Sequence, residues 1–210
     1  MTPEDESNLL DAWRAGSHEA GNQLMRAYYG RVLGFFAMRA PTAADDLTQR
    51  TFLACVEGRE RVRESSVGAF VFGIARKMLL KYLDAKRRDQ SFAIESARPQ
   101  SILSPSGVVA QRSEHLLLLR ALERLPDEAQ ILVGMHYVAG LRSREIGDAL
   151  GLPTSTVTTR LSRAREALRA EVQSLRAPPQ ARASVLADFE TWAASLGPLI
   201  TDREPPFGGG

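Results

Sequence analysis

The sequence contains one cysteine and no long apolar run, and both scarcities exclude classes of protein. Cys55 alone cannot form an internal disulfide, which excludes a secreted disulfide scaffold and favours a reducing compartment. No stretch approaches the roughly 20 apolar residues of a membrane span. The acidic first residues lack the basic and then apolar order of a signal peptide. We therefore expect a cytoplasmic protein with no membrane insertion.

Catalytic and metal-binding patterns are equally scarce. His18, His115 and His136 are scattered, and Cys55 has no partner at a zinc-ligand spacing. The glycines at the chain end do not follow a strand, as a phosphate-binding loop requires, and no serine lies in a nucleophile-elbow sequence. We therefore expect neither catalysis nor a cofactor nor a metal site.

Helical periodicity is what the sequence does have. Of its 210 residues, 44% are hydrophobic and 25% are charged, which is typical of a globular protein. The formal net charge of +2 is nearly neutral, so local blocks of charge decide what the protein binds. Apolar residues recur at spacings of three and four, whereas alternating strand patterns of useful length are absent. The expected fold class is all-α.

Breaks in the periodicity define a first small helical domain over residues 1–89. Gly16 and Ser17 are expected to separate its first two helices, Pro41 to end the second, and Thr42 to cap the third. A long amphipathic helix follows and ends in a cluster of basic residues. This domain is therefore predicted to be a compact helical bundle.

A flexible linker is predicted over residues 90–112, which are rich in proline, glycine and serine. A second small helical domain follows over residues 113–176. Residues 177–210 form a C-terminal extension that begins with two prolines and contains an amphipathic piece with Phe189 and Trp192. Our hypothesis is that this extension packs back on the protein and modulates access to its partners.

The most specific pattern is a helix-turn-helix at residues 143–164. Gly151 lies where the first helix must stop, and glycine tolerates the left-handed conformation that this stop needs. Gly147 permits close approach of a second helix, which Pro153 or Thr154 is expected to open. This arrangement is the one that a DNA-reading motif requires. Four residues at spacings of three and four are expected to face inward: Val157, Leu161, Ala164 and Leu168.

The opposite face of the second helix carries short hydroxyl side chains and arginines suited to a major groove. Ser155, Thr159, Ser162 and Arg163 lie opposite Val157 on a helical wheel, with Thr156 beside them. Further arginines are expected to meet phosphates: Arg160, Arg165 and Arg169. The alternative is a helical hairpin whose arginines form only a solvated face.

Two blocks of sequence resemble extracytoplasmic-function (group IV) sigma factors of the sigma-70 family. Residues 118–172, LLRALERLPDEAQILVGMHYVAGLRSREIGDALGLPTSTVTTRLSRAREALRAEV, resemble region 4 of that family. DDLTQRTFLAC and SSVGAFVFGIARKMLLKYLDAKRR, in the first domain, resemble region 2. The blocks occur in the order and spacing of the family. Together they cover roughly residues 20 to 175, and the pair is far more specific than either block alone.

The resemblance implies a division of labour. Region 2 docks on a coiled coil of the largest subunit of bacterial RNA polymerase and recognises and melts the −10 promoter element. Region 4 reads the −35 element and binds a flap on the second-largest subunit. Catalysis belongs to the polymerase. The implied partners are the polymerase core, promoter DNA and an anti-sigma factor, although no residue here identifies the last.

Polymerase contact is expected near the start of one helix in the first domain. Acidic residues there also favour the helix dipole, and spacing alone leaves the two interpretations even. The resemblance favours a polar patch with an apolar anchor that binds a basic coiled coil. The candidate polymerase-binding residues are Asp45, Asp46, Gln49 and Phe52.

DNA contact is expected from a basic helix in the first domain and from the recognition helix of the second. Basic and aromatic neighbours together suit an opened strand, through phosphate contact and base stacking; Phe70 fits a place in the core equally well. The candidate −10 residues are Arg61, Arg63, Ser65, Phe70, Phe72, Arg76, Lys77 and Lys81. The candidate −35 residues are Ser155, Thr156, Thr158, Thr159, Arg160 and Arg163.

Four positions depart from the pattern of the family. Phe70 stands where many relatives have tryptophan, Lys77 where they have asparagine, and Arg50 where they have an acid. Thr158 often has a lysine counterpart. These departures put the usual −10 base preference, one polymerase contact and one phosphate contact in doubt.

A stand-alone DNA-binding regulator with a helical sensor domain is the alternative function. The acidic docking helix and the basic helix argue against it, because a sensor domain needs neither.

Overall fold

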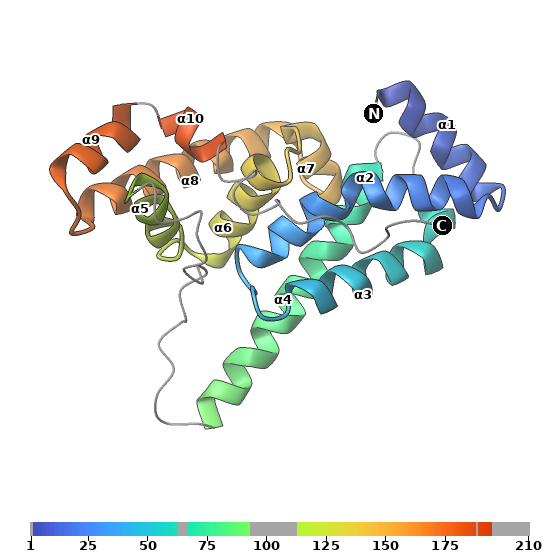
Figure 1. Cartoon of the computed structure of the whole chain (residues 1–210), viewed down its shortest axis with the longest axis horizontal. Coiled ribbons are helices and arrows are strands. Elements are labelled where there is room, and N and C mark those ends of the chain that lie inside the picture. Colours follow the sequence, from blue (N-terminus) through green and yellow to red (C-terminus); the bar gives the residue numbers. More distant parts are fainter. Residues whose placement is uncertain (1, 63–66, 93–112, 188, 195–210) are drawn as a thin grey trace.

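The computed structural model describes residues 2–62, 67–92, 113–187 and 189–194 (Figure 1). Within these ranges the chain is helical and contains no strand, which confirms the predicted all-α class. The N-terminal unit consists of α1 (Pro3–Arg14), α2 (His18–Ala37), α3 (Ala44–Glu57), a short 3-10 turn η1 (Arg59–Arg61) and α4 (Val67–Phe92). The predicted linker lies outside the described residues except for 90–92, which continue α4.

The C-terminal unit consists of α5 (Ser113–Leu122), α6 (Asp127–Val133), a π-helical turn η3 (Gly134–Val138), α7 (Ser143–Leu150) and α8 (Thr154–Ser174). Two further helices, α9 (Pro179–Ala187) and α10 (Phe189–Ala194), come from the C-terminal extension. Figure 1 shows them at the end of the molecule farthest from α1 and α3.

The first helix boundaries follow the local chemistry, with one exception. Gly16 has a positive φ of 102° and separates α1 from α2, as predicted. The Ser17 hydroxyl accepts a hydrogen bond from the Ala20 amide and so caps α2. The predicted cap at Thr42 is wrong, because Ala43 holds the N-cap position of α3 without a side-chain hydrogen bond. The acids of the first turn of α3 complement the helix dipole instead.

The two units share one apolar core. Tyr28, Phe35, Phe36 and Phe72 of the N-terminal unit are its largest fully buried side chains. The same cluster continues into Leu141, Ile146, Val157 and Leu161 of the C-terminal unit. A second cluster joins α5 and α8 to Val185 and Phe189 of the extension and includes Met38 of the N-terminal unit. The units are therefore packed against each other, chiefly through α4 with α7 and α2 with η3.

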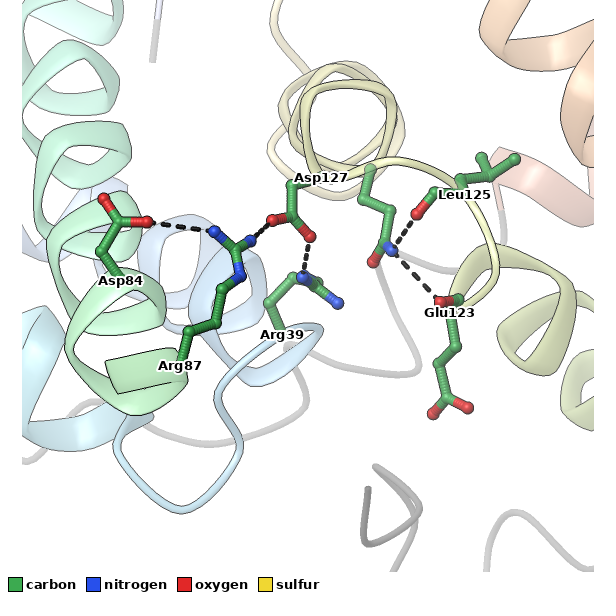
Figure 2. Close-up of polar contacts among 7 residues, drawn as sticks. Arg39, Asp84, Arg87, Glu123, Leu125 and Asp127 are labelled. Carbon is green, nitrogen blue, oxygen red and sulfur yellow. Dashed lines mark hydrogen bonds and ion pairs between the residues drawn. The ribbon is translucent and has the colours of Figure 1, made fainter. Parts of the chain in front are cut away.

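Polar contacts reinforce the packing between the units. Asp127, at the first position of α6, accepts hydrogen bonds from both Arg39 and Arg87 of the N-terminal unit (Figure 2). Arg87 also pairs with Asp84 on its own helix at 3.0 Å. The side chain of Arg39 is only 17% exposed, and its burial lowers the pKa of the guanidinium. Removing Asp127 would leave a buried charge without its partner.

Candidate nucleic-acid interface

The predicted helix-turn-helix is present in α7 and α8. Gly151 ends α7 in the left-handed conformation, with φ 65° and ψ 35°. A Cβ at Gly147 would lie 2.7 Å from the Leu152 carbonyl oxygen, so only glycine permits this tight turn. Helix α8 opens at Thr154, one of the two residues expected to open it, and Pro153 holds the N-cap position.

The buried stripe of α8 matches the sequence pattern. Val157, Leu161, Ala164 and Leu168 are all at most 3% exposed, so the helix has one fixed orientation in the unit. The alternative of a bare helical hairpin is therefore disfavoured, because the turn, the close approach and the buried stripe coincide. The opposite face is left for a partner.

That opposite face carries the predicted −35 residues. Ser155, Thr158, Thr159, Arg160 and Arg163 are exposed, and Thr156 is half-buried. The Thr158 and Thr159 hydroxyls each donate to a carbonyl one turn back at 3.0 Å. Their oxygens can still accept a hydrogen bond, for example from a base amino group. Base reading by these residues remains a prediction.

The polymerase-binding prediction needs one correction, at Phe52. Asp45, Asp46 and Gln49 are exposed on α3, as expected. Phe52 is only 7% exposed, however, and its ring stacks on Tyr29 with centroids 6.2 Å apart. It belongs to the core and offers little apolar surface to a partner.

Two residues that the sequence did not suggest supply the apolar surface of α3. Leu53 is 61% exposed and Val56 45%, and they are the large hydrophobic side chains that stand out among the described residues. Asp46, Gln49, Leu53 and Val56 follow one another at helical spacings of three, four and three, so they share one face. This spacing could have indicated a shared face from the sequence. The prediction instead placed the apolar anchor at Phe52, the aromatic residue one position before Leu53. We call these four residues the α3 face.

The −10 candidates divide into surface and core. Lys77 and Lys81 are exposed on α4, and Arg76 is half-buried. Phe72 is fully buried and meets Phe35 edge-on at 5.7 Å, so the structure contradicts its assignment to DNA contact. Arg63 and Ser65 lie outside the described residues.

A cavity of about 780 Å³ lies between the two units and brings three −10 candidates together. Arg61, Phe70 and Lys77 line one side. The helix-turn-helix closes the other side with Asp148 and Gly151. The predicted −10 residues in the cavity therefore face α7, the helix before the recognition helix, and the surface of α4 is partly covered by α7.

Other kinds of site find no support in the described part of the chain. No group of three or more His, Cys, Asp or Glu side chains there could hold a metal ion. Burial raises the pKa of the Cys55 thiol to about 12, which keeps it protonated. In the same ranges, no helix combines the length and the apolar character that crossing a membrane requires.

Known proteins with similar sequences and folds were compared with the chain. The family described as "Sigma-70, region 4" matches residues 115–168, which span α5 to most of α8. The "ECF RNA polymerase sigma-E factor" of Salmonella typhimurium is 24% identical over 179 residues, covering 80% of this chain and 94% of that protein. The chain is an extracytoplasmic-function sigma factor of the sigma-70 family.

Two solved structures share the fold of this sigma factor. CnrH, solved in complex with the cytosolic domain of CnrY, has a TM-score of 0.58 and 18% identity, covering 81% of this chain and 98% of CnrH. The sigma factor RpoE of Bartonella quintana was solved with the anti-sigma factor NepR. It has a TM-score of 0.51 and 19% identity, and the match covers 73% of this chain and 92% of RpoE.

The family assignment decides between the functions that the sequence left open. A sigma factor is an initiation subunit of RNA polymerase and not an enzyme in its own right. The stand-alone regulator is not favoured, because the relatives match across both units and not only at the helix-turn-helix. The match to the region 4 family ends at residue 168, before α9 and α10 begin.

Proposed function

We propose that this sigma factor binds bacterial RNA polymerase core in the cytoplasm and directs it to promoters with specific −35 and −10 elements, under stress or signal control. The observation that supports the proposal is the presence, in one chain, of two separate faces predicted to bind DNA together with the exposed α3 face. A regulator that only binds DNA needs no second DNA face and no apolar docking surface.

Geometry requires the two units to separate when both promoter elements are bound. Elements centred near −35 and −10 are about 25 base pairs apart, or about 85 Å at 3.4 Å per base pair. In the structure α4 contacts α7, which the turn at Gly151 joins directly to α8, so the DNA faces of α4 and α8 lie far closer than that. We propose that the structure is a closed state, which opens on polymerase.

An anti-sigma factor is a further proposed partner. The similar RpoE of B. quintana is bound to the anti-sigma factor NepR in its structure. A partner that stabilises the closed state would keep the surface of α4 covered by α7 and the sigma factor inactive. The inducing signal would then act by releasing that partner.

Substitution of the apolar pair on the α3 face tests polymerase binding. We expect Leu53→Glu with Val56→Glu to weaken binding to polymerase core by tenfold or more, since an apolar anchor at an interface centre contributes roughly 1–4 kcal/mol. Stability should change little, because both side chains are exposed. Affinity is measured by fluorescence anisotropy with purified core.

Asn8→Glu is the control for added negative charge, because Asn8 is exposed on α1 and the substitution adds one such charge away from the α3 face, against two in the variant. It should bind core as the unmodified protein does. Equal core affinity of the Leu53/Val56 variant and the control would contradict docking through the α3 face.

A further inference from the structure

Two helices of the C-terminal extension are built into the C-terminal unit. Helix α9 packs on α5 and α8, and helix α10 packs on α5 and η3. Val185 and Phe189 are 0% and 2% exposed, so they complete the core of the unit. Helices α9 and α10 therefore hold a fixed place beside the recognition helix α8, which agrees with the hypothesis that this segment packs back on the protein.

This packing brings one carboxylate to a cluster of cationic and hydroxyl groups. Glu190 of α10 pairs with Arg165 at 3.5 Å and with Arg169 at 3.9 Å. The Tyr137 hydroxyl donates a hydrogen bond to Glu190 Oε2 at 2.7 Å. The Arg169 guanidinium also lies over the Phe189 ring, 4.6 Å from its centroid. Two arginines and a hydroxyl donor thus converge on one acidic group.

The two arginines extend a row that begins at the predicted DNA face. Thr158, Ser162, Arg165 and Arg169 follow one another at spacings of four, three and four, so they form one stripe along α8. At 1.5 Å of rise per residue, Arg165 lies about 15 Å along the axis from Ser155. A recognition helix in a major groove about 12 Å wide brings such a position to the phosphates at the groove edge.

We infer that Tyr137, Arg165 and Arg169 form a binding site for a DNA backbone phosphate, which Glu190 occupies in the protein without DNA. A phosphate offers what the carboxylate offers, namely anionic oxygens that accept from arginine and hydroxyl donors. The site rests on the proposed function, because its ligand belongs to the DNA that region 4 reads.

The contacts of Glu190 are weak enough for a DNA phosphate to replace its carboxylate. The side chains of Arg165, Arg169 and Glu190 are 31%, 45% and 54% exposed, and ion pairs at such positions stabilise little. Burial and the bond to Glu190 raise the pKa of Tyr137 to about 12, so its hydroxyl stays a donor for either anion. The buried Phe189 keeps α10 in place, so Glu190 competes with every phosphate that approaches.

Removal of the charge of Glu190 tests this site. The probe is a short DNA duplex of arbitrary sequence, because phosphate contacts do not depend on sequence. We expect Glu190→Gln in the full chain to bind this duplex roughly two- to fivefold more tightly. The plot of log affinity against log salt should steepen by up to about one unit, as expected for one more phosphate contact. Adding Arg165→Gln and Arg169→Gln should abolish both gains.

Glu128→Gln is the matched control, since Glu128 is exposed on α6 and the change in charge is the same. Thermal denaturation should show all of these variants folded. Equal affinity of Glu190→Gln and Glu128→Gln, including no binding by either, would overturn the inference. The two failures are distinguishable, because loss of promoter-directed transcription by the unmodified protein would instead count against the proposed function.

Discussion

Phe72→Ala is expected to lower the free energy of unfolding by about 3–5 kcal/mol, as truncation of a fully buried phenylalanine does. Phe72 is 0% exposed, meets Phe35 edge-on and lies 5.9 Å from the Arg31 guanidinium. The cavity left behind would sit at the centre of the core that both units share. Because small domains have only about 5–15 kcal/mol of stability, the loss should be plain in urea denaturation followed by circular dichroism.

Phe70→Ala is the matched comparison, two residues away on the same helix. Phe70 is only half-buried and lines the cavity between the units. Its loss should cost less stability but weaken binding of single-stranded −10 DNA, where stacking contributes roughly 1–3 kcal/mol per base. The opposite result would be a Phe72→Ala variant that is more stable than Phe70→Ala and binds DNA more weakly. That result would contradict our conclusion that Phe72 belongs to the core and does not contact DNA.

Gly73→Leu is expected to open the contact between the two units without unfolding either. A Cβ at Gly73 would lie 3.3 Å from the Ala149 carbonyl oxygen of α7, and backbone cannot turn aside as a side chain can. A leucine there must push α7 away, whereas within α4 itself leucine is a better helix former than glycine. The radius of gyration from small-angle X-ray scattering should therefore rise.

Opening should also uncover the cavity face of α4. If the added side chain costs the closed state roughly 1–3 kcal/mol, apparent affinity for single-stranded DNA rises roughly five- to a hundredfold, since less free energy is spent on opening. Gly73→Ala adds only the Cβ and should give a much smaller effect. An unchanged radius and unchanged DNA affinity for Gly73→Leu would contradict the closed-state interpretation.

Sequence reasoning worked where local chemistry dominates. The break at Gly16 and Ser17, the left-handed Gly151 and the stripe from Val157 to Leu168 depend on residues close together in the chain, so periodicity and turn chemistry predicted them. The Thr42 cap failed for a similarly local reason. Cap propensity is a weak preference, and the N-cap position of α3 falls one residue later, at Ala43.

Three features could not be read from the sequence because they depend on contacts across the fold. Phe52 and Phe72 are aromatic residues on amphipathic helices, and only tertiary packing decides which face of the helix is covered. The ion pairs of Asp127 join residues 88 and 40 positions apart, and the shared core joins the first unit to residues of the second. Likewise, nothing in the sequence near Glu190 indicates that it lies beside Arg165 and Arg169.

Run-off transcription with purified RNA polymerase core on a pool of genomic promoter fragments tests the central claim most directly. With this protein added, free of any anti-sigma factor, we expect discrete transcripts from a small set of fragments that share −35 and −10 sequences. Core polymerase alone should give none of these start sites. Transcripts that are the same with and without the protein would show that it does not select promoters.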